Sequence, residues 1–361
     1  MASVDLIEHR LRSHLLAAPE GGVVAAARHM VATQAQEWWA GRWGLALRTS
    51  GTPGAAAVDS AFDDGLLVRS WTQRGTLHIV AAGDLRSFLA LTADRQHAQA
   101  ASVHRSRGID AAVITRVERS VHRALADAGR LSRAELFDVM RADGLDTGDM
   151  RGSLLLQALS LRGLICQGPT RPEPDGLSRE QWFVLVDDVV PDGKAADLAT
   201  LFTRFVHGHG PASSRDFAWW MGLTRTAARA AALAATDVER LDDDLWAPLL
   251  TPRDPAAPDL VALPAFDEYV LSYVDRSAVC APEDLSAVGP TANGVLSPVL
   301  LHRGRVIGTW THSRARGRLA QRPVATLFAT AADQVAPGEI EAALSRYTGF
   351  LGGGGVRRQT H

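Results

Sequence analysis

Hydrophobic and polar positions follow one another in the same order three times along this chain. Each time, stretches with the period of a helix precede two stretches with the period of a strand. The middle copy is the clearest, because Val113, Val117, Val121 and Leu125 recur at helical spacing behind Asp110, a predicted N-cap. This spacing predicts a helix that buries one face.

Two further helices and two strands complete the middle copy. Ser132-Arg133-Ala134-Glu135 forms a capping box that predicts a helix through Met140, and a leucine-rich helix from about Asp149 to Arg162 follows it. The strand-like runs Leu164–Cys166 and Trp182–Val186 flank a proline-rich loop. A helix, a helix-turn-helix and a two-stranded wing make a winged helix, a fold that usually binds nucleic acid.

The first and third copies repeat this order. In the first copy we predict helices near 6–17, 23–35 and 55–62, then strands 67–71 and 76–80 joined by a tight turn. In the third copy we predict a helix at 198–205, a second helix after the capping box 213–216, and a third near 226–235. We expect strand 260–263 to pair with 238–241 or with 245–247. The proline-rich loop near 248–258 would then form the wing.

Beyond the third copy, 265–274 and 295–312 are predicted strands, with a hairpin at 301–306. The fold class is therefore α+β, with three tandem winged-helix units followed by C-terminal β-hairpins. We place the units at 1–105, 106–192 and 193–350, and expect a flexible glycine-rich tail at 351–361.

Composition excludes several classes of protein. The 361 residues are 46% hydrophobic, enough for a substantial core. No apolar run approaches the roughly 20 residues of a membrane span, and the first residues lack a signal-peptide core, so we expect a cytoplasmic protein without a membrane partner. Cys166 and Cys280 are the only cysteines. They allow neither a disulfide framework nor a four-cysteine metal site, and we expect no metal and no cofactor.

Charge is segregated along the chain, although the net charge is only -2. Between Arg69 and Arg133 there are 11 arginines against 5 acidic residues, and between Leu301 and Arg322 there are 6 arginines and no acid. Phosphate contacts need local positive charge, so this pattern favours a basic DNA-binding face. Ordinary solvation of surface arginines is the alternative explanation.

Five motifs together give the chain a family resemblance: Thr33-Gln34-Ala35-Gln36, Arg74-Gly75-Thr76-Leu77-His78, Arg215-Asp216-Phe217-Ala218-Trp219-Trp220, Leu263-Pro264-Ala265-Phe266-Asp267-Glu268-Tyr269 and Gly308-Thr309-Trp310. The set, spread from about Leu6 to Phe328, resembles the AlkZ-type winged-helix DNA glycosylases, relatives of the YcaQ proteins. The resemblance implies a C-shaped scaffold, removal of alkylated purines from double-stranded DNA without a metal, and unhooking of interstrand crosslinks.

The resemblance also maps the family's catalytic Gln-apolar-Gln motif onto Gln34 and Gln36. YcaQ proteins end this motif in Asp, so Gln36 places the chain nearer the AlkZ branch. A carboxamide has no titrating group and can only orient water. Such a site suits N7-alkylguanine and N3-alkyladenine, whose positively charged rings leave as neutral bases. Two merely solvated glutamines in a helix are the alternative.

A carboxylate near the developing sugar cation would complete this chemistry, and Asp267 is our first candidate. Glu268 and Glu37 are others, and Asp267 alternatively caps a turn or pairs with Arg276. Lys194 is the single lysine of the chain and lies among aspartates, as expected for a surface ion pair. A Schiff base requires an amine nucleophile, so we predict a monofunctional glycosylase, acting as a monomer.

The candidates for contacting DNA lie on two predicted hairpins and in the segment just beyond Trp310. These candidates are Arg69, Arg74, His78, Arg303, Arg305, Arg314, Arg316 and Arg318. His78 is as well explained by a place inside the hairpin. For Trp38, Trp39 and Trp43 we favour core packing over a base-stacking pocket, and we assign Trp219 and Trp220 to the core as well.

Two other functions fit winged helices. A transcription regulator needs base-reading side chains and a dimerising element, but the helices near 154–161 and 226–235 are leucine- and alanine-rich. A DNA-binding protein without catalytic activity is the second alternative.

Overall fold

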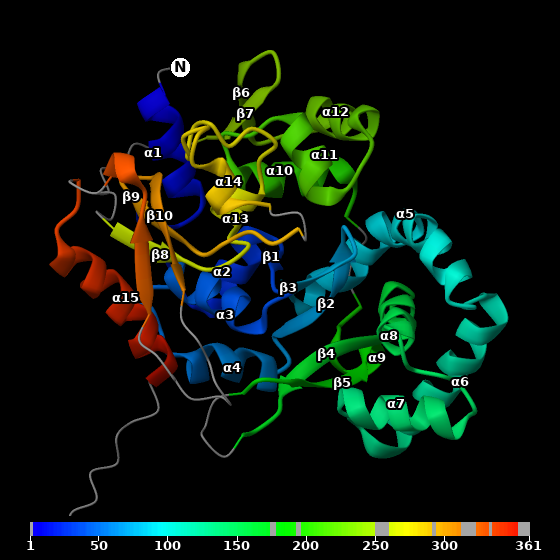
Figure 1. Ribbon diagram of the computed structural model, residues 1–361. Coiled ribbons are helices and arrows are strands. Elements are labelled where there is room, and N and C mark those ends of the chain that lie inside the picture. Colours follow the sequence, from blue (N-terminus) through cyan, green and yellow to red (C-terminus); the bar gives the residue numbers. More distant parts are fainter. Residues whose placement is uncertain are drawn as a thin grey trace, which may run out of the picture.

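The computed structural model describes residues 3–173, 178–192, 196–249, 260–290, 294–311, 323–331 and 334–352. Figure 1 shows their arrangement. The α-helices are α1 (Ser3–Ser13), α2 (Val23–Met30), α3 (Trp38–Leu47), α4 (Ala55–Asp63), α5 (Leu85–Ser106), α6 (Ala111–Ala128), α7 (Arg133–Ala142), α8 (Arg151–Leu161), α9 (Val186–Val189), α10 (Leu198–His209), α11 (Ser214–Met221), α12 (Arg225–Ala234), α13 (Glu268–Leu271), α14 (Leu285–Val288) and α15 (Pro337–Gly352). The strands are β1 (Thr33–Gln34), β2 (Leu67–Gln73), β3 (Thr76–Ala81), β4 (Ile165–Thr170), β5 (Gln181–Leu185), β6 (Val238–Asp242), β7 (Leu245–Pro248), β8 (Leu260–Leu263), β9 (Val299–His302), β10 (Arg305–Thr311) and β11 (Val324–Leu327). Within the described ranges, 3-10 turns lie at Ala82–Asp84 and Ala329–Ala331.

The α+β class is confirmed, and helices precede an antiparallel hairpin three times. These runs are α2 to α4 before β2 and β3, α6 to α8 before β4 and β5, and α10 to α12 before β6 and β7. The division into three winged-helix units on a C-shaped scaffold, with the boundaries given above, remains a prediction.

Local capping signals act where the sequence predicts them. Asp110 accepts a hydrogen bond from the backbone of Val113 at the start of α6. Reciprocal capping boxes open α7 at Ser132 and α11 at Ser213. Each cap satisfies backbone N–H groups that a helix leaves without partners, which explains why these helices begin there.

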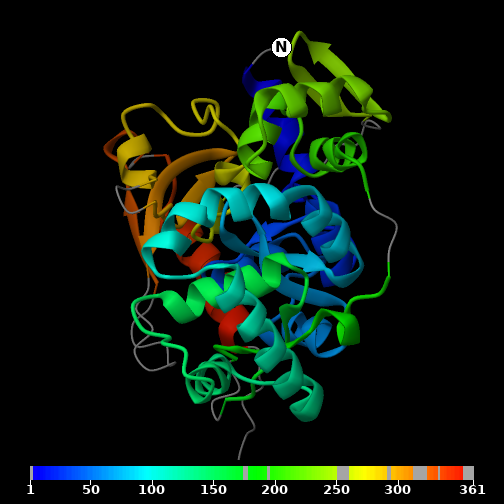
Figure 2. The ribbon, with the colours of Figure 1, turned by 90° about the vertical axis from the view of Figure 1, so that its right-hand side faces the viewer.

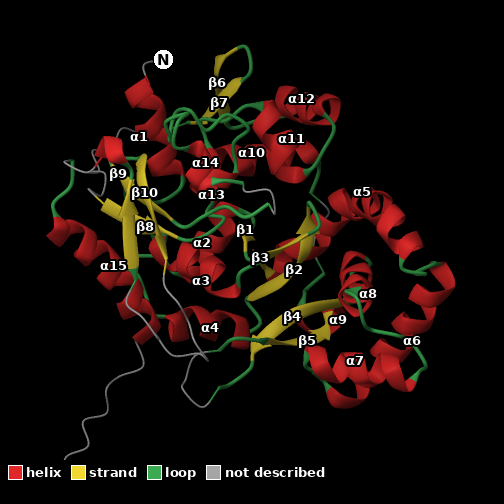
Figure 3. Cartoon of the chain, viewed as in Figure 1, coloured by secondary structure: helices red, strands yellow, loops and turns green. Residues whose placement is uncertain are grey.

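Sheet pairing joins segments that the sequence alone does not connect. The first two hairpins share one five-stranded sheet of order β1-β3-β2-β4-β5, in which Arg69 lies opposite Gln167. A second sheet of order β11-β10-β9-β8 lies on the other side of the N-terminal helices (Figure 3). The hairpins β2–β3 and β4–β5 are therefore parts of one continuous sheet.

Three expected elements differ from the structure. The helix expected at 23–35 ends at Met30, where Val31 takes a φ of 63°, and β1 pairs with β3 instead. The segment 265–274, expected as a strand, contains the single helical turn α13 capped by Asp267. Strand β8 pairs with β9, and not with β6 or β7. These three predictions were wrong, because hydrophobic periodicity does not show which distant segment a strand or turn contacts.

Apolar side chains form two large clusters. One combines the helices of the middle and third copies with the hairpins β2–β3 and β4–β5. The other joins α1 to α4 with β8 to β10 and α15, so the first and last parts of the chain share a core. In Figure 2 the long helix α5 (cyan) crosses in front of the N-terminal elements (blue). Among the described residues, no helix has the length and apolar character needed to cross a membrane.

Candidate active site

The strand β1 fixes the position of the glutamine motif. Thr33 lies opposite Ile79 and Gln34 opposite His78, and the backbone N–H of Ala35 donates to Leu77 at 2.8 Å. Gln34 is buried, whereas Gln36 is exposed in the loop before α3. The motif is therefore an edge strand and a loop, and not part of a helix as expected. Its two carboxamides lie at the boundary between core and solvent.

Both amide oxygens of the motif are held near the backbone. Oε1 of Gln34 accepts from the backbone N–H of Gln36 at 3.2 Å, and Oε1 of Gln36 accepts from the backbone N–H of Leu77 at 3.3 Å. An amide oxygen has two lone pairs, so each retains the capacity to accept from a water molecule. The arrangement restricts the two side chains to a narrow set of orientations.

Arg69 forms hydrogen bonds with the backbone of this motif. Its guanidinium donates to the backbone oxygens of Ala35 at 2.8 Å and Gln36 at 3.2 Å, and to Oε1 of Gln167 at 2.7 Å. Burial lowers the pKa of Arg69 to about 9, so the side chain stays charged at neutral pH. These hydrogen bonds direct the Arg69 guanidinium toward the motif, and contact of Arg69 with DNA stays a prediction.

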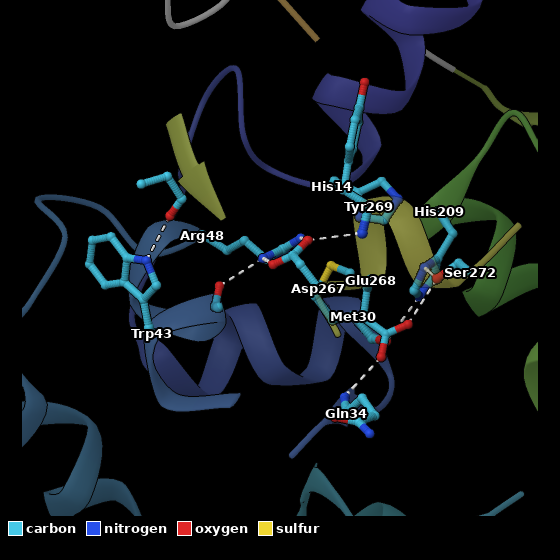
Figure 4. Close-up of polar contacts among 12 residues, drawn as sticks. His14, Met30, Gln34, Trp43, Arg48, His209, Asp267, Glu268, Tyr269 and Ser272 are labelled. Carbon is cyan, nitrogen blue, oxygen red and sulfur yellow. Dashed lines mark hydrogen bonds and ion pairs between the residues drawn. The ribbon is translucent and has the colours of Figure 1, made fainter. Parts of the chain in front are cut away.

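Glu268 is the carboxylate that contacts the motif. Its Oε1 accepts from the backbone N–H of Gln34 at 2.8 Å, and its Oε2 accepts from Trp220 Nε1 at 2.9 Å and from the Ser272 hydroxyl at 2.8 Å (Figure 4). Glu268 is 1% exposed. Burial raises the pKa of this carboxyl, against the opposing effect of the Arg74 guanidinium and its three hydrogen-bond donors.

A chain of contacts from Glu268 returns to the end of α2. The Ser272 hydroxyl oxygen lies 3.0 Å from His209 Nδ1, and His209 Nε2 lies 3.2 Å from the backbone oxygen of Met30. Met30 ends α2 and Gln34 lies in β1, so α13 and α10 together hold both ends of the turn that leads into the motif.

Asp267 points away from the motif. Its oxygens accept from Arg48 at 2.8 and 2.9 Å, and Oδ1 also accepts from the backbone N–H of Tyr269. Figure 4 shows Asp267 and Glu268 directed to opposite sides of α13. Asp267 therefore caps a helical turn, as in our alternative, but pairs with Arg48 and not with Arg276. The catalytic role of Asp267 stays a prediction, and Glu268 is the neighbouring carboxylate that contacts the motif.

The two remaining candidates on the first hairpin differ in access. Arg74 lies in the turn between β2 and β3, with a φ of 51°. Burial lowers the pKa of Arg74, and the negative charge of Glu268 opposes this shift. His78 is fully buried, with Nδ1 at 3.0 Å from the Thr72 hydroxyl and 3.1 Å from the backbone oxygen of Thr76. Both partners lie within the hairpin, as in our alternative for His78, and its contact with DNA stays a prediction.

The C-terminal candidates are only partly covered by the described residues. Arg303 and Arg305 are exposed on the β9–β10 hairpin, which forms where the sequence predicts it. Arg314, Arg316 and Arg318 lie outside the described residues, as do Lys194, the tail from 353 onward and most of the expected proline-rich wing.

Tryptophans divide between core and surface. Trp38, Trp43 and Trp220 are buried and Trp39 is partly buried, in agreement with core packing. Trp219 is 42% exposed, so its assignment to the core was wrong. Periodicity missed this because consecutive residues of a helix point about 100° apart, and only the tertiary contacts show which of the two tryptophans is covered.

Comparisons with known proteins show the family and the fold of the chain. Residues 27–350 match the family described as DNA glycosylase AlkZ-like. A curated relative from Streptomyces sahachiroi, an interstrand DNA cross-link repair glycosylase, is 27% identical over 300 residues, covering 77% of this chain and 78% of the relative. The solved structure of Streptomyces sahachiroi DNA glycosylase AlkZ has the same fold, with a TM-score of 0.77, 23% identity and 97% of each chain covered.

Proposed function

Because the chain belongs to the AlkZ-like DNA glycosylase family, we propose that it hydrolyses the N-glycosidic bond of cationic alkylpurines in double-stranded DNA. N7-alkylguanine and N3-alkyladenine are the proposed substrates. The observation that carries the proposal is the meeting of Gln34, Gln36 and Glu268 at the edge of the first sheet.

The reaction needs little acid or base catalysis. Water attacks C1′ of the sugar, the bond to the purine nitrogen breaks, and its electron pair neutralises the positive ring. The carboxamides of Gln34 and Gln36 orient this water through their oxygens and NH₂ groups. The attacking water then gives its proton to the solvent.

Glu268 supplies negative charge beside the sugar cation that develops as the bond breaks. A fixed charge in a water-poor site stabilises such a transition state more than it would in water. Trp220, Ser272 and the Gln34 backbone hold this carboxylate in place. Arg74 favours its ionised form.

Crosslinked purines are a second class of proposed substrate. A purine alkylated at N7 carries the same positive ring whether its substituent is a methyl group or a link to the opposite strand. The curated relative bears the name of an interstrand cross-link repair glycosylase. We propose hydrolysis of the same bond in both cases, by a monofunctional enzyme that needs no metal or cofactor and acts as a monomer.

The first prediction tests the two glutamines. We expect Gln34→Ala and Gln36→Ala each to lower the rate of release of N7-methylguanine from a defined duplex by about 10²-fold or more, since a small loss of positioning has effects of this size. Gln334→Ala changes an exposed glutamine ahead of α15 and serves as the control. Free base is measured in single-turnover assays.

Three outcomes would contradict the proposal. Full activity in both variants removes the orienting role, and efficient release of uracil shows that a positive ring is not required. Binding of DNA without release of any base by the wild type indicates a regulator or a non-catalytic DNA-binding protein. A covalent complex trapped with borohydride would contradict the monofunctional mechanism.

A further inference from the structure

Several large apolar side chains are exposed in the described part of the chain, and Trp219 is the aromatic one among them. Its exposed fraction is 42%. Its Nε1 donates to the backbone oxygen of Leu271 at 2.9 Å. The one polar group of the indole is thereby satisfied inside the protein, and the ring has a fixed orientation. What Trp219 presents to solvent is a rigid aromatic surface.

Two arginines flank this ring. The guanidinium carbon of Arg74 lies 5.8 Å from the ring centroid and that of Arg276 lies 6.0 Å away. Nε of Arg276 donates to the backbone of Val270 at 2.8 Å, which holds its head near the indole. An aromatic surface flanked by positive charge is the arrangement with which proteins bind unpaired nucleotides.

A basic pocket of about 380 Å³ adjoins the same face of α11. Arg215 lines it and precedes Trp219 by four residues, so both lie on one face of the helix. Arg10 also lines the pocket: it is 5% exposed, its Nε donates to the backbone of Pro211 at 3.1 Å, and its head lies 3.6 Å from the Tyr273 ring centroid. Arg305 is exposed beside the pocket.

The charges of this pocket leave an excess of cation. Nη1 of Arg10 is buried and has no hydrogen-bond partner. Asp216 caps α11 and accepts from the backbone of Val274, and Asp275 accepts from the backbone of Ser277. These two carboxylates face three guanidiniums, so an anion is the ligand that the pocket suits.

Both features lie next to the proposed catalytic centre. Trp220, the next residue of α11, donates to Glu268, which in turn accepts from Gln34. Trp219 itself is bonded to the last residue of α13, the helical turn that carries Glu268. A nucleotide held here is a close neighbour of the nucleotide being hydrolysed.

We propose that Trp219 and the pocket of Arg10, Arg215 and Arg305 bind one unstacked nucleotide of the DNA at the lesion. The indole stacks on the base, and the pocket takes an adjacent backbone phosphate. The proposal rests on the glycosylase function and gives it a means of holding DNA open. Bound in this way, the nucleotide holds the stack open beside the lesion, whose sugar is then accessible to Gln34 and Gln36.

Binding of undamaged DNA tests the proposal without any excision. The probes are a duplex with one unpaired nucleotide and the fully paired duplex of the same sequence, measured by fluorescence anisotropy at several salt concentrations. Trp219→Ala lowers affinity for the first probe by roughly 5- to 150-fold, abolishes the preference over the second, and leaves the salt dependence unchanged. Trp219→Phe retains the preference because it keeps an aromatic surface.

The phosphate contact is tested separately. The double variant Arg215→Ala, Arg305→Ala reduces the slope of log affinity against log salt by about one unit, as expected for the loss of one phosphate contact, and keeps the preference for the unpaired nucleotide. Trp182→Ala is the matched control, because Arg130 and Arg171 flank Trp182 on β5 in the same way.

Several results would overturn the proposal. One is an unchanged preference in Trp219→Ala, and another is an equal loss in Trp219→Phe, which would assign the effect to the bond with Leu271. An unchanged salt slope in the double arginine variant removes the phosphate site. Because no base is excised, failure of the glycosylase proposal would appear only in the assay of base release.

Discussion

Asp267 and Glu268 are adjacent carboxylates with different surroundings. Asp267 is buried against the Arg48 guanidinium, with which it forms two charge-assisted hydrogen bonds. Glu268 is buried against the neutral donors of Gln34, Trp220 and Ser272. The first arrangement stabilises the fold, whereas the second leaves a charge beside the proposed reaction centre.

Replacing each carboxylate by its amide separates these roles. We expect Glu268→Gln to lower the rate of N7-methylguanine release by about 10²-fold, and to lower the free energy of unfolding by about 1–3 kcal/mol, because the amide NH₂ group replaces an acceptor oxygen and leaves one buried N–H donor without a partner. Asp267→Asn leaves Arg48 buried without a charged partner and lowers the free energy of unfolding by about 3–5 kcal/mol. Denaturant unfolding and single-turnover rates measure the two effects. The reverse pattern would assign the catalytic role to Asp267.

At the scale of elements, the motif depends on the close contact between β1 and α3. A Cβ added at Gly41 of α3 would lie 2.6 Å from Ala35 Cβ and 2.9 Å from Ile79 Cδ1. Ala35 separates Gln34 from Gln36, and Ile79 belongs to the strand that pairs with β1. Glycine at position 41 therefore lets the helix approach the backbone of the motif.

We expect Gly41→Ala to destabilise the protein by about 1–3 kcal/mol, the usual cost of overpacking. The displaced Ala35 would also lower the rate of base release in the fraction that remains folded, by about 10²-fold for a shift of about 1 Å. Gly338→Ala is the control, since its Cβ meets no atom within 4 Å. An active Gly41→Ala enzyme would show that the motif tolerates movement.

At the scale of the whole molecule, buried histidines connect the first and last parts of the chain. His14, directly after α1, contacts the Tyr273 hydroxyl at 2.8 Å, and Tyr273 donates to the backbone oxygen of His209 at 2.5 Å. Burial lowers the pKa of His209 to about 3, and lowers those of His14 and His78 well below their usual value. All three are neutral in the folded protein near neutral pH.

These shifts predict that stability falls in acid. Between pH 6.5 and about 3 the unfolded chain binds protons that the folded chain excludes, so the free energy of unfolding decreases as pH falls. Each such histidine contributes about 1.4 kcal/mol per pH unit below its unfolded pKa. Burial raises the pKa of Glu268, so the contribution of this group to the free energy of unfolding is lost as pH rises through its folded pKa.

Denaturant unfolding at pH 7, 6 and 5 measures this dependence. We expect His209→Gln to be less stable at pH 7 and to have a shallower slope, by about 1 kcal/mol per pH unit below pH 6. His122→Gln, at an exposed position of α6, is the control and should keep the wild-type slope. Identical slopes in His209→Gln and the wild type would contradict the neutral, buried state of His209.

The sequence by itself determined what depends on nearby residues. The capping boxes at Ser132 and Ser213, the N-cap Asp110 and the hairpins β2–β3 and β9–β10 form where it predicts them. It also supplied the motifs that identify the family. Caps, turns and short motifs are set by neighbours within a few positions, so their signals are complete in the sequence.

Only the tertiary structure decided what depends on distant partners. Gln34 meets Glu268 across 234 positions, and Arg69 lies opposite Gln167 in a sheet shared by two hairpins. The same contacts ended α2 early, turned Asp267 away from the motif and left Trp219 exposed. The physical reason is that burial and strand pairing are properties of the surfaces that come together, and hydrophobic periodicity does not specify which surfaces those are.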